Sequence, residues 1–244
     1  MLGIFSKTID SNLVEAIGYS GLDFMIFDQE HGTADFTTIQ NHVRAAKLTG
    51  LTSVIRVPEN NHNLIGSAFD TGANAVQVPN ISSYKEAKSA IDAAKFYPKG
   101  NRGVCCYVKS AKFGTEEKKS YFNKANKKQL ILQVERKKGI ESIDQILELE
   151  NFDILFIGPY DLSQSLGYPG QVDHPEVIKA INDLATKVKS SGKTLGTFVD
   201  HVNKIKQFQE KGFGYIAYSV DLNIFTNSIK QISLDYGDRS SIDR

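Results

Sequence analysis

Several short apolar runs of this chain end in side chains that can ionise or form strong hydrogen bonds. These groups close or follow the runs at residues 24–28, 53–57, 130–135 and 154–158, and they are Asp28, His31, Arg56, Gln133, Glu135, Tyr160 and Asp161. An ionised group at the end of a buried run is costly unless it is paired or bound to a metal. We therefore expect these side chains to share one polar site.

Glu135 and Asp161 are the two carboxylates that we pair as metal ligands. Two carboxylates completed by water and substrate oxygens suit Mg²⁺, with Mn²⁺ or Co²⁺ as alternatives. The structural alternative for these carboxylates is a salt bridge or a helix cap, and Asp161 in particular could cap a short helix beginning at Leu162. Two carboxylates at neighbouring strand ends favour the metal site.

His31 is the candidate general base, because a histidine titrates near neutral pH. Asp28 stands three residues earlier and is expected to orient it. Arg56 can bind a carboxylate or a developing oxyanion, or it can form a structural ion pair with Asp28 or Glu30. The remaining histidines are interpreted as structural, and they are His42, His62, His174 and His201.

Gln133 shares a strand face with Glu135, because alternate residues of a strand point the same way. It can bind a ligand or hold a neighbouring side chain.

No lysine falls within or at the end of the apolar runs, the first of which is expected at residues 2–5. An aldolase that forms a Schiff base on lysine is therefore disfavoured. No glycine-rich phosphate cradle follows the last two runs, which favours a carboxylate substrate over a sugar phosphate.

Eight apolar runs alternate with amphipathic segments along the chain. The runs are residues 2–5, 24–28, 53–57, 75–78, 130–135, 154–158, 194–198 and 215–219. Apolar side chains recur at helical spacing in residues 12–19, 36–48, 84–96, 140–149 and 175–188. Runs without polar alternation predict strands buried on both faces, hence a parallel sheet. Eight of them predict an α/β fold, a (β/α)8 TIM barrel, as a single domain over residues 1–244. No G-x-G-x-x-G follows a strand, which disfavours an open dinucleotide-binding sheet.

The composition narrows the classes of function. Among 244 residues, Lys and Arg number 29 and Asp and Glu number 28, a balance unlike that of a nucleic-acid-binding domain. No apolar run approaches the roughly 18 residues of a membrane span, and the first residues lack a secretory leader pattern. Cys105 and Cys106 are adjacent, so we expect free thiols, a reducing compartment and a cytoplasmic protein. Their role is left open.

One connection is unusually long. Residues 99–115 form an irregular stretch between the fourth helix and the fifth strand, and such connections are usually functional. The lysine-rich segment that follows, residues 118–128, is interpreted as a solvated helix face.

Six motifs, in this order and spacing, resemble the HpcH/HpaI aldolase family, the metal-dependent 2-oxo acid aldolases related to the citrate lyase β-subunit. They are FDQEH (27–31), VIRVP (54–58), KGNRGV (99–104), LQVE (132–135), FIGPYDLS (156–163) and HPEV (174–177). The similarity extends from Gly3 to about Ile232. The chain begins almost at its first strand, so the family's N-terminal helix is expected to be absent or trimmed.

The resemblance implies roles for the candidate residues. Glu135 and Asp161 match the metal ligands, and the metal would chelate the keto and carboxylate oxygens of pyruvate or a similar 2-oxo acid. Arg56 matches the arginine that stabilises the enolate oxygen. His31, with Asp28 as its partner, matches the histidine that transfers the proton.

The resemblance extends to substrate contacts and assembly. The backbone at Tyr160 and Asp161 matches the segment that holds the substrate carboxylate, and Gln133 matches a polar residue lining the site. A homo-oligomer, a hexamer with an exchanged C-terminal helix, is implied. Two departures are Arg136, where the family often has threonine, and the loop at residues 105–114. That loop is expected to border the site and to select the acceptor.

Three functions remain open at this level. The first is an aldolase that forms or cleaves 4-hydroxy-2-oxo acids, with pyruvate as donor and an aldehyde as acceptor. The second is an aldol-adding synthase that uses oxaloacetate, a keto acid, as acceptor and forms citrate in a siderophore-type pathway. The third is a non-catalytic barrel that binds a metabolite.

Overall fold

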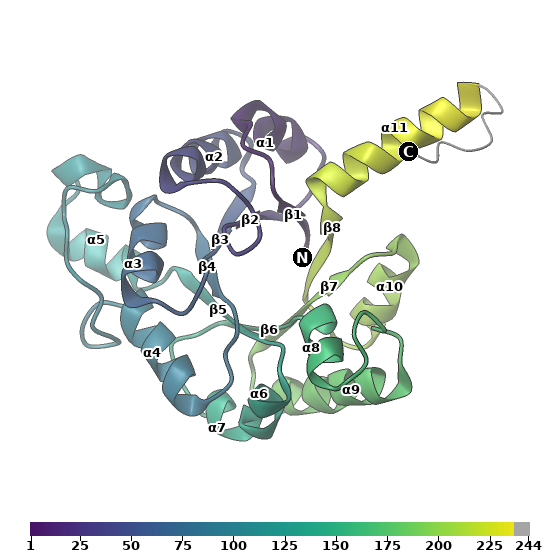
Figure 1. Cartoon of the computed structure of the whole chain (residues 1–244). Coiled ribbons are helices and arrows are strands. Elements are labelled where there is room, and N and C mark those ends of the chain that lie inside the picture. Colours follow the sequence, from purple (N-terminus) through teal and green to yellow (C-terminus); the bar gives the residue numbers. More distant parts are fainter. Residues whose placement is uncertain (237–244) are drawn as a thin grey trace.

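The eight apolar runs form eight parallel strands, and the structure, a computed structural model, describes residues 1–236. The strands are β1 (Leu2–Ser6), β2 (Phe24–Asp28), β3 (Thr52–Arg56), β4 (Ala75–Val78), β5 (Gln129–Val134), β6 (Ile154–Ile157), β7 (Thr194–Val199) and β8 (Tyr215–Val220). Each strand pairs with the next in the sequence, and β1 pairs with β8, so the sheet closes into a barrel (Figure 1). The predicted (β/α)8 fold is confirmed.

Large apolar side chains fill the interior of the barrel. Phe24 and Tyr215 stack with their ring centroids 3.9 Å apart, and the Phe156 ring meets Tyr215 edge-on at 6.1 Å. On β2, Phe24 and Ile26 belong to this interior cluster, and Asp28 continues the same face at the carboxyl end. The strands therefore change from apolar to polar along the barrel axis, and the polar end carries the candidate site.

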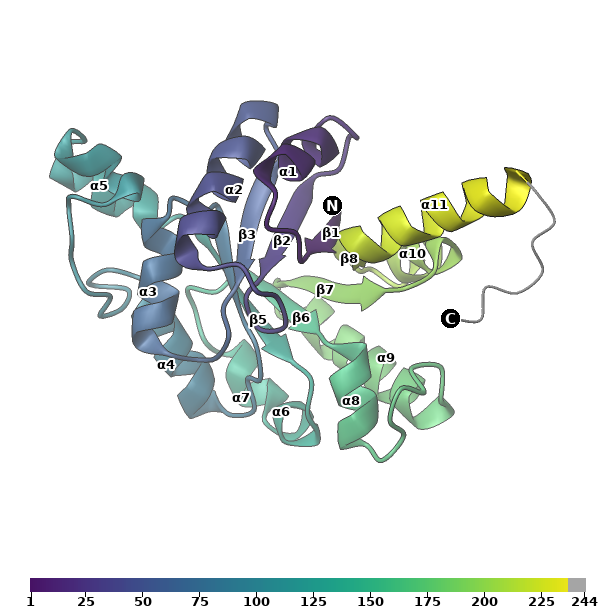
Figure 2. The ribbon, with the colours of Figure 1, turned by 45° about the horizontal axis from the view of Figure 1, so that its top comes forward.

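Helices surround the barrel (Figures 1 and 2). They are α1 (Ser11–Gly18), α2 (Phe36–Thr49), α3 (His62–Asp70), α4 (Tyr84–Ala94), α5 (Lys118–Ala125), α6 (Lys137–Glu141), α7 (Ile143–Leu147), α8 (Pro159–Ser165), α9 (Pro175–Ser190), α10 (Val202–Glu210) and α11 (Asp221–Tyr236).

Local sequence signals set the helix boundaries. The Asp35 side chain accepts a hydrogen bond from the Thr38 N–H and caps α2, and Gly50 ends that helix with a left-handed φ of 79°. His174 caps α9, whose first residue is Pro175. The single helix predicted over residues 140–149 is wrong in detail, because α6 and α7 are separate short helices that meet at Ser142.

The long connection at residues 99–115 lies outside α3 and α4 and contains the 3₁₀ helix η1 (Lys109–Gly114). Inside it, Lys112 and Phe113 adopt left-handed φ angles of 51° and 55°. Cys105 and Cys106 are free thiols, as predicted. The lysine-rich segment that follows forms α5.

The last described helix, α11, extends away from the barrel (Figures 1 and 2). Its exposed apolar side chains are Leu222, Phe225, Ile229, Ile232, Leu234 and Tyr236. Across residues 1–236, no helix has the length and hydropathy to span a bilayer. The predicted single domain includes residues 237–244, which lie outside the described residues.

The interior aromatic stack generates a stability prediction. Phe24 is fully buried, so we expect Phe24→Ala to lower the free energy of unfolding by about 3–5 kcal/mol, measured by urea denaturation. The control is Val202→Ala at an exposed site, which should change it by less than about 0.5 kcal/mol. Equal effects of the two substitutions would contradict the packing described for the barrel interior.

Candidate active site

A cavity of about 280 Å³ opens at the carboxyl ends of the strands. The side chains that line it come from nearly every strand end and from the first turn of α8, and they include all seven residues predicted from the sequence: Asp28, His31, Arg56, Gln133, Glu135, Tyr160 and Asp161. The structure therefore brings the predicted polar groups together. The position agrees with the reactive end of a barrel of this type.

Arg56 is held by two carboxylates. Its Nε and Nη2 donate to the two carboxylate oxygens of Asp28 at 2.9 and 2.8 Å, and its Nη1 lies 3.0 Å from Glu30 Oε2. Asp28 and Arg56 are register partners on β2 and β3, which accounts for the bidentate geometry. Burial alone would raise the pKa of Asp28, but the hydrogen bond and charge of Arg56 outweigh it and lower the pKa. The structural ion pairs considered for Arg56 both form, and the guanidinium still lines the cavity.

His31 is exposed at the mouth of the same cavity. Asp28 Oδ1 accepts hydrogen bonds from the backbone N–H groups of Glu30 and His31 at 3.0 and 3.2 Å. The expected contact between Asp28 and the imidazole is absent among residues 1–236. Asp28 shapes the loop that carries His31, because its two oxygens are occupied by Arg56 and by these amides.

Glu135 is held by a relay of amide side chains. Gln77 Nε2 donates to Gln133 Oε1, and Gln133 Nε2 donates to Glu135 Oε2. The backbone N–H of Asn80 donates to Glu135 Oε1 at 2.8 Å. Both ends of the Gln133 side chain are thus engaged, so it holds a neighbouring side chain, one of the two roles considered for it. Gln77 was not predicted, although it is a polar residue on the interior face of an apolar strand.

The electrostatic environment of Glu135 is unfavourable to its charged form. Burial, with smaller contributions from the negative charges of Glu30 and Asp161, raises its pKa to about 7 despite the hydrogen bonds it accepts. Burial and the charges of Asp28 and Asp161 also raise the pKa of Glu30, against the attraction of Arg56. Across the described part of the chain, Glu135 forms no ion pair, so the salt bridge considered for it is absent.

Asp161 lies in the first turn of α8, which begins at Pro159. It is therefore not the cap of a helix beginning at Leu162. Gly158 precedes that turn, and a Cβ on it would lie 2.4 Å from Glu135 Oε2, so only glycine leaves room for the carboxylate. The N–H groups in the first turn of a helix have no partner within the helix, so those of Tyr160 and Asp161 can donate hydrogen bonds to an anion there.

The Tyr160 side chain is anchored away from those amides. Its hydroxyl donates to Asp200 Oδ2 at 2.7 Å. Burial and this hydrogen bond to a charged carboxylate raise the pKa of Tyr160 to about 12. The phenol is therefore neutral at physiological pH, and the pair fixes one wall of the cavity.

The donor set fits a hard divalent cation. Within residues 1–236, no three His, Cys, Asp or Glu side chains cluster closely enough to hold a metal ion by themselves. The two carboxylates of Glu135 and Asp161 line one cavity, and the charge of Asp161 disfavours the charged form of Glu135, which a cation would reverse. Mg²⁺ is commonly bound by one or two carboxylates and completes its oxygen shell with water and substrate. The residues present fit such an ion.

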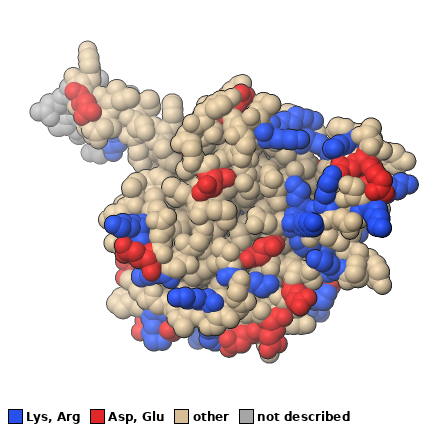
Figure 3. Space-filling view, turned by 180° about the vertical axis from the view of Figure 1, so that it is seen from behind, with Lys and Arg blue, Asp and Glu red and all other residues tan. Residues whose placement is uncertain are grey.

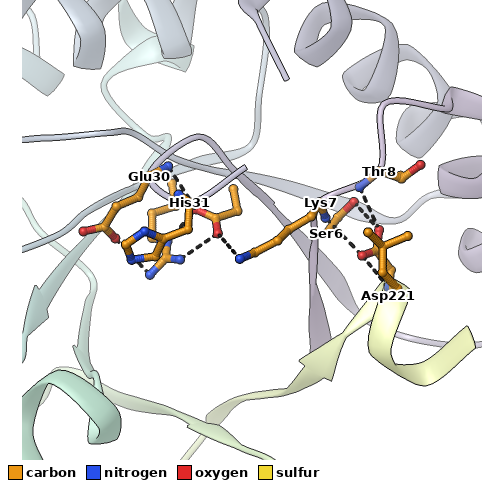
Figure 4. A network of polar contacts seen from close by, with 9 residues as sticks. Ser6, Lys7, Thr8, Glu30, His31 and Asp221 are labelled. Atoms are coloured by element: carbon orange, nitrogen blue, oxygen red, sulfur yellow. Dashed lines mark hydrogen bonds and ion pairs between the residues drawn. The ribbon is translucent and has the colours of Figure 1, made fainter. Parts of the chain in front are cut away.

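Lys7 is a site residue that the sequence reasoning missed. It lines the cavity with its Nζ 3.9 Å from Asp28 Oδ2, and Figure 4 shows it pointing toward the loop of Glu30 and His31. The statement that no lysine stands at a strand end is therefore wrong. β1 extends to Ser6 instead of residue 5, and Lys7 continues the interior face of Phe5. This alternation was the signal that could have found it.

Asp221 at the start of α11 fastens the segment that carries Lys7. Its carboxylate accepts from the Ser6 hydroxyl at 2.8 Å and from the backbone N–H groups of Lys7 and Thr8 at 3.0 and 3.2 Å (Figure 4). The first strand and the last helix are thereby joined at the rim of the site.

The loop at residues 105–114 does not border this cavity, so that prediction is wrong for a single chain. The loop connects a helix to a strand, and such connections lie at the amino end of a barrel, opposite the reactive end. The sequence could have predicted this position, because the loop follows a predicted helix and precedes a predicted strand.

Comparison with known proteins places these features in a family. The family model described as "HpcH/HpaI aldolase/citrate lyase" matches residues 1–228. A 5-keto-4-deoxy-D-glucarate aldolase of Shigella boydii is 30% identical over 95% of this chain and 90% of its own length. A 2-dehydro-3,6-dideoxy-6-sulfogluconate aldolase of Pseudomonas putida is 28% identical over 95% of this chain and 90% of its own length.

Comparison with solved structures gives the same family. A HpcH/HpaI aldolase/citrate lyase family protein from Burkholderia cenocepacia superposes with a TM-score of 0.92 at 29% identity, covering 97% of this chain and 94% of its own. Two more distant structures show the shared fold alone. They are the citrate synthase SbnG (TM-score 0.87, 24% identity, 96% and 92% covered) and a Mycobacterium tuberculosis citrate lyase β subunit with oxaloacetate and magnesium (0.57, 14%, 90% and 90%).

The environment of Glu135 generates a prediction on stability and pH. The folded pKa of about 7 lies above the ordinary value of 4.5, so the metal-free protein loses stability as the pH rises through this interval. With a chelator at pH 8, Glu135→Gln should therefore be more stable than the wild type by about 3 kcal/mol and should unfold at a higher temperature. Differential scanning calorimetry measures this.

Added Mg²⁺ should raise the melting temperature of the wild type but not that of Glu135→Gln, because the variant lacks a ligand. Glu141→Gln, at an exposed glutamate of α6, should behave like the wild type in both conditions. A chelated Glu135→Gln protein that is less stable than the wild type at pH 8 would contradict the account of this carboxylate.

Proposed function

The chain belongs to the HpcH/HpaI aldolase/citrate lyase family, and we propose that it is a divalent-metal-dependent aldolase, a carbon–carbon lyase acting on 4-hydroxy-2-oxo acids through a pyruvate-type enolate. The observation that carries the proposal is the pairing of Glu135 and Asp161 with the Arg56 guanidinium around one cavity. Such an arrangement stabilises negative charge on a small keto acid from two sides.

The charge-stabilising groups have separate roles in this proposal. A Mg²⁺ ion held by Glu135 and Asp161, with Mn²⁺ or Co²⁺ as alternatives, would act as a Lewis acid toward the keto oxygen of the substrate. Arg56, fixed by Asp28 and Glu30, presents its remaining surface to the same oxygen as it becomes an enolate oxygen. Removal of one such stabiliser typically costs about 2.7–4 kcal/mol of transition-state free energy.

His31 moves the proton. In cleavage, the 4-hydroxyl loses its proton as the bond between C3 and C4 breaks, and the electron pair of that bond forms the enolate of pyruvate. The enolate then takes up a proton at its terminal carbon. The exposed imidazole at the cavity mouth is placed for this transfer, while Asp28 acts as a positioning residue through the loop.

The first turn of α8 holds the substrate carboxylate in this proposal. The N–H groups of Tyr160 and Asp161 are without intrahelical partners, and both residues line the same cavity as Glu135. Gln133 supports the site indirectly, because its amide positions Glu135.

An aldehyde is the proposed acceptor. The relatives with about 30% identity over nearly the whole chain are described as aldolases of sugar-acid derivatives. The alternative, oxaloacetate as acceptor in a citrate-forming synthase, has only the fold-level likeness to SbnG in its support. Product analysis with pyruvate and either acceptor distinguishes the two.

Hydrogen exchange at the methyl group of pyruvate tests the enolate directly. The wild type with Mg²⁺ should exchange these hydrogens with deuterium in D₂O, followed by NMR. His31→Ala and Asp161→Asn should each slow the exchange by about 100-fold or more, because His31 is the proposed proton carrier and Asp161 is a proposed ligand of the cation. Both positions are exposed, so the fold should be unaffected.

Asp183→Asn, at an exposed position of α9, is the matched control and should exchange at the wild-type rate. Unimpaired exchange in Asp161→Asn would remove it from the metal site, and a barrel that binds pyruvate without exchange would support the non-catalytic alternative. Borohydride treatment with pyruvate should leave Lys7 unmodified, since the proposed enolate requires no Schiff base.

We also propose that the protein is a cytoplasmic homo-oligomer, a hexamer in which subunits exchange α11. Its support is the extension of that helix from the barrel with a row of exposed apolar side chains, including Phe225 and Ile229. Exposed apolar surface of this extent is typical of an interface.

The assembly is tested by sedimentation velocity. Phe225→Asp with Ile229→Asp should convert the oligomer to a folded monomer, because two charges would be buried in the interface. Asn227→Asp, which adds a charge to an exposed polar position of the same helix, should preserve it. An unchanged sedimentation coefficient for the double variant would contradict the exchange of α11.

A further inference from the structure

A second, larger cavity lies at the opposite end of the barrel. This basic groove has a volume of about 930 Å³, and its walls are α2, α3, the connection with η1, and α5. Thr52 and Asn74, at the amino ends of β3 and β4, also line it. It is therefore separate from the candidate active site, which opens at the carboxyl ends of the strands.

Cations dominate the basic groove. They are Arg44, Lys47, Arg102, Lys109, Lys112, Lys124 and Lys128, and the one acidic side chain among the lining residues is Glu116. Figure 3 shows blue side chains gathered on the side of the molecule that carries these helices. This accumulation is local, because the formal net charge of the whole chain is only +1.

Most of this positive charge has no counterion in the described part of the chain. Lys112 and Lys124 both pair with Glu116, and Arg102 pairs with Asp70. Among residues 1–236, no carboxylate pairs with the other four cations, which are Arg44, Lys47, Lys109 and Lys128. About four positive charges therefore converge on the groove from three separate segments of the chain.

The buried side chain of Arg102 has a hydrogen-bond donor without an acceptor in the described part of the chain, which is an observation independent of the charge count. Its side chain is only 2% exposed and lies between the rings of Phe69 and Phe96, with Cζ 5.2 and 4.7 Å from the two ring centroids. Its Nε has no hydrogen-bond partner among the described residues. Buried donors are normally satisfied, so a lining residue of the groove whose guanidinium N–H lacks an acceptor is consistent with a ligand that accepts hydrogen bonds there.

Lys109 is partly buried among the other cations of the groove. Its Nζ donates to the Thr71 carbonyl at 2.8 Å, which anchors the ammonium at the groove. Burial, followed by the positive charges of Arg44, Lys47 and Lys128, lowers its pKa to about 8. Glu116 is the one carboxylate in the groove and already serves Lys112 and Lys124, so an external anion would relieve this repulsion.

We propose that the basic groove binds a small anion that carries two or more phosphate groups. A single carboxylate or sulfate would leave most of the four unpaired cations uncompensated, whereas a chain of phosphates can contact several of them at once. The volume suits a small-molecule ligand. The apolar side chains of Val43, Leu48 and Leu51 line the same groove and can accept a nonpolar part such as a nucleobase.

Calorimetric titration of the full-length protein with inorganic triphosphate tests the proposal. The wild type should bind with a Kd of about 1 mM or tighter at moderate salt. Arg44→Gln combined with Lys47→Gln should weaken binding about ten-fold or more, because both side chains are exposed on α2 and carry unpaired charge. Lys206→Gln, at an exposed lysine of α10, should bind like the wild type.

A second variant shows whether weaker binding comes from the lost charge or from a folding defect. Lys128→Gln removes a groove charge from a different segment, and it should weaken triphosphate binding in the same way. The rate of pyruvate methyl exchange should stay at the wild-type value in these variants, because the groove is remote from the active site. ATP that binds as tightly as triphosphate, or tighter, would support the proposal and report whether the apolar wall contributes.

Three results would overturn it. The first is triphosphate binding that is no tighter than sulfate binding or is insensitive to both sets of variants. The second is a single-stranded oligonucleotide that binds far more tightly than triphosphate, which would make the groove a nucleic-acid surface. The third is a loss of oligomerisation in Arg44→Gln/Lys47→Gln, which would make it a subunit interface.

Discussion

The carboxylate of Glu135 is buried at the mouth of the barrel without a cationic partner among the described residues, and the rest of the site is organised around this imbalance. The one guanidinium in the cavity, that of Arg56, is already shared by Asp28 and Glu30. Glu135 instead receives neutral donors, the Gln133 amide and the Asn80 N–H. Neutral donors orient a carboxylate without cancelling its charge, so the site retains affinity for a cation.

The barrel separates the groups that support this carboxylate from those that stabilise the fold. Interior side chains are aromatic or aliphatic along most of the strands, and amides or ions replace them in the last layer. Gly158 gives Glu135 its space, and Gln77 fixes the direction in which Gln133 donates. At the other end of the barrel, a long connection and α5 form the basic groove, so the two chemical environments are separated by the apolar interior.

Sequence patterns predicted the barrel and the meeting of seven polar residues at one cavity well, and the contacts among them less well. Eight apolar runs were sufficient for the strands, because both faces of a parallel strand are buried. Side chains at the ends of those runs had to converge once the barrel closed. The contacts of Asp28 depend on strand register and loop conformation, which periodicity does not contain. Lys7 was missed because β1 is one residue longer than predicted. The division of one predicted helix into α6 and α7 was missed because the helix breaks locally at Ser142.

A crystal structure of the protein with Mg²⁺ and oxalate, a mimic of the pyruvate enolate, tests the central claim most directly. The account predicts one cation between the carboxylates of Glu135 and Asp161, with both ends of oxalate in contact with it and Arg56 beside one oxygen. Oxalate bound in the cavity without a cation, or a cation held away from both carboxylates, would contradict it.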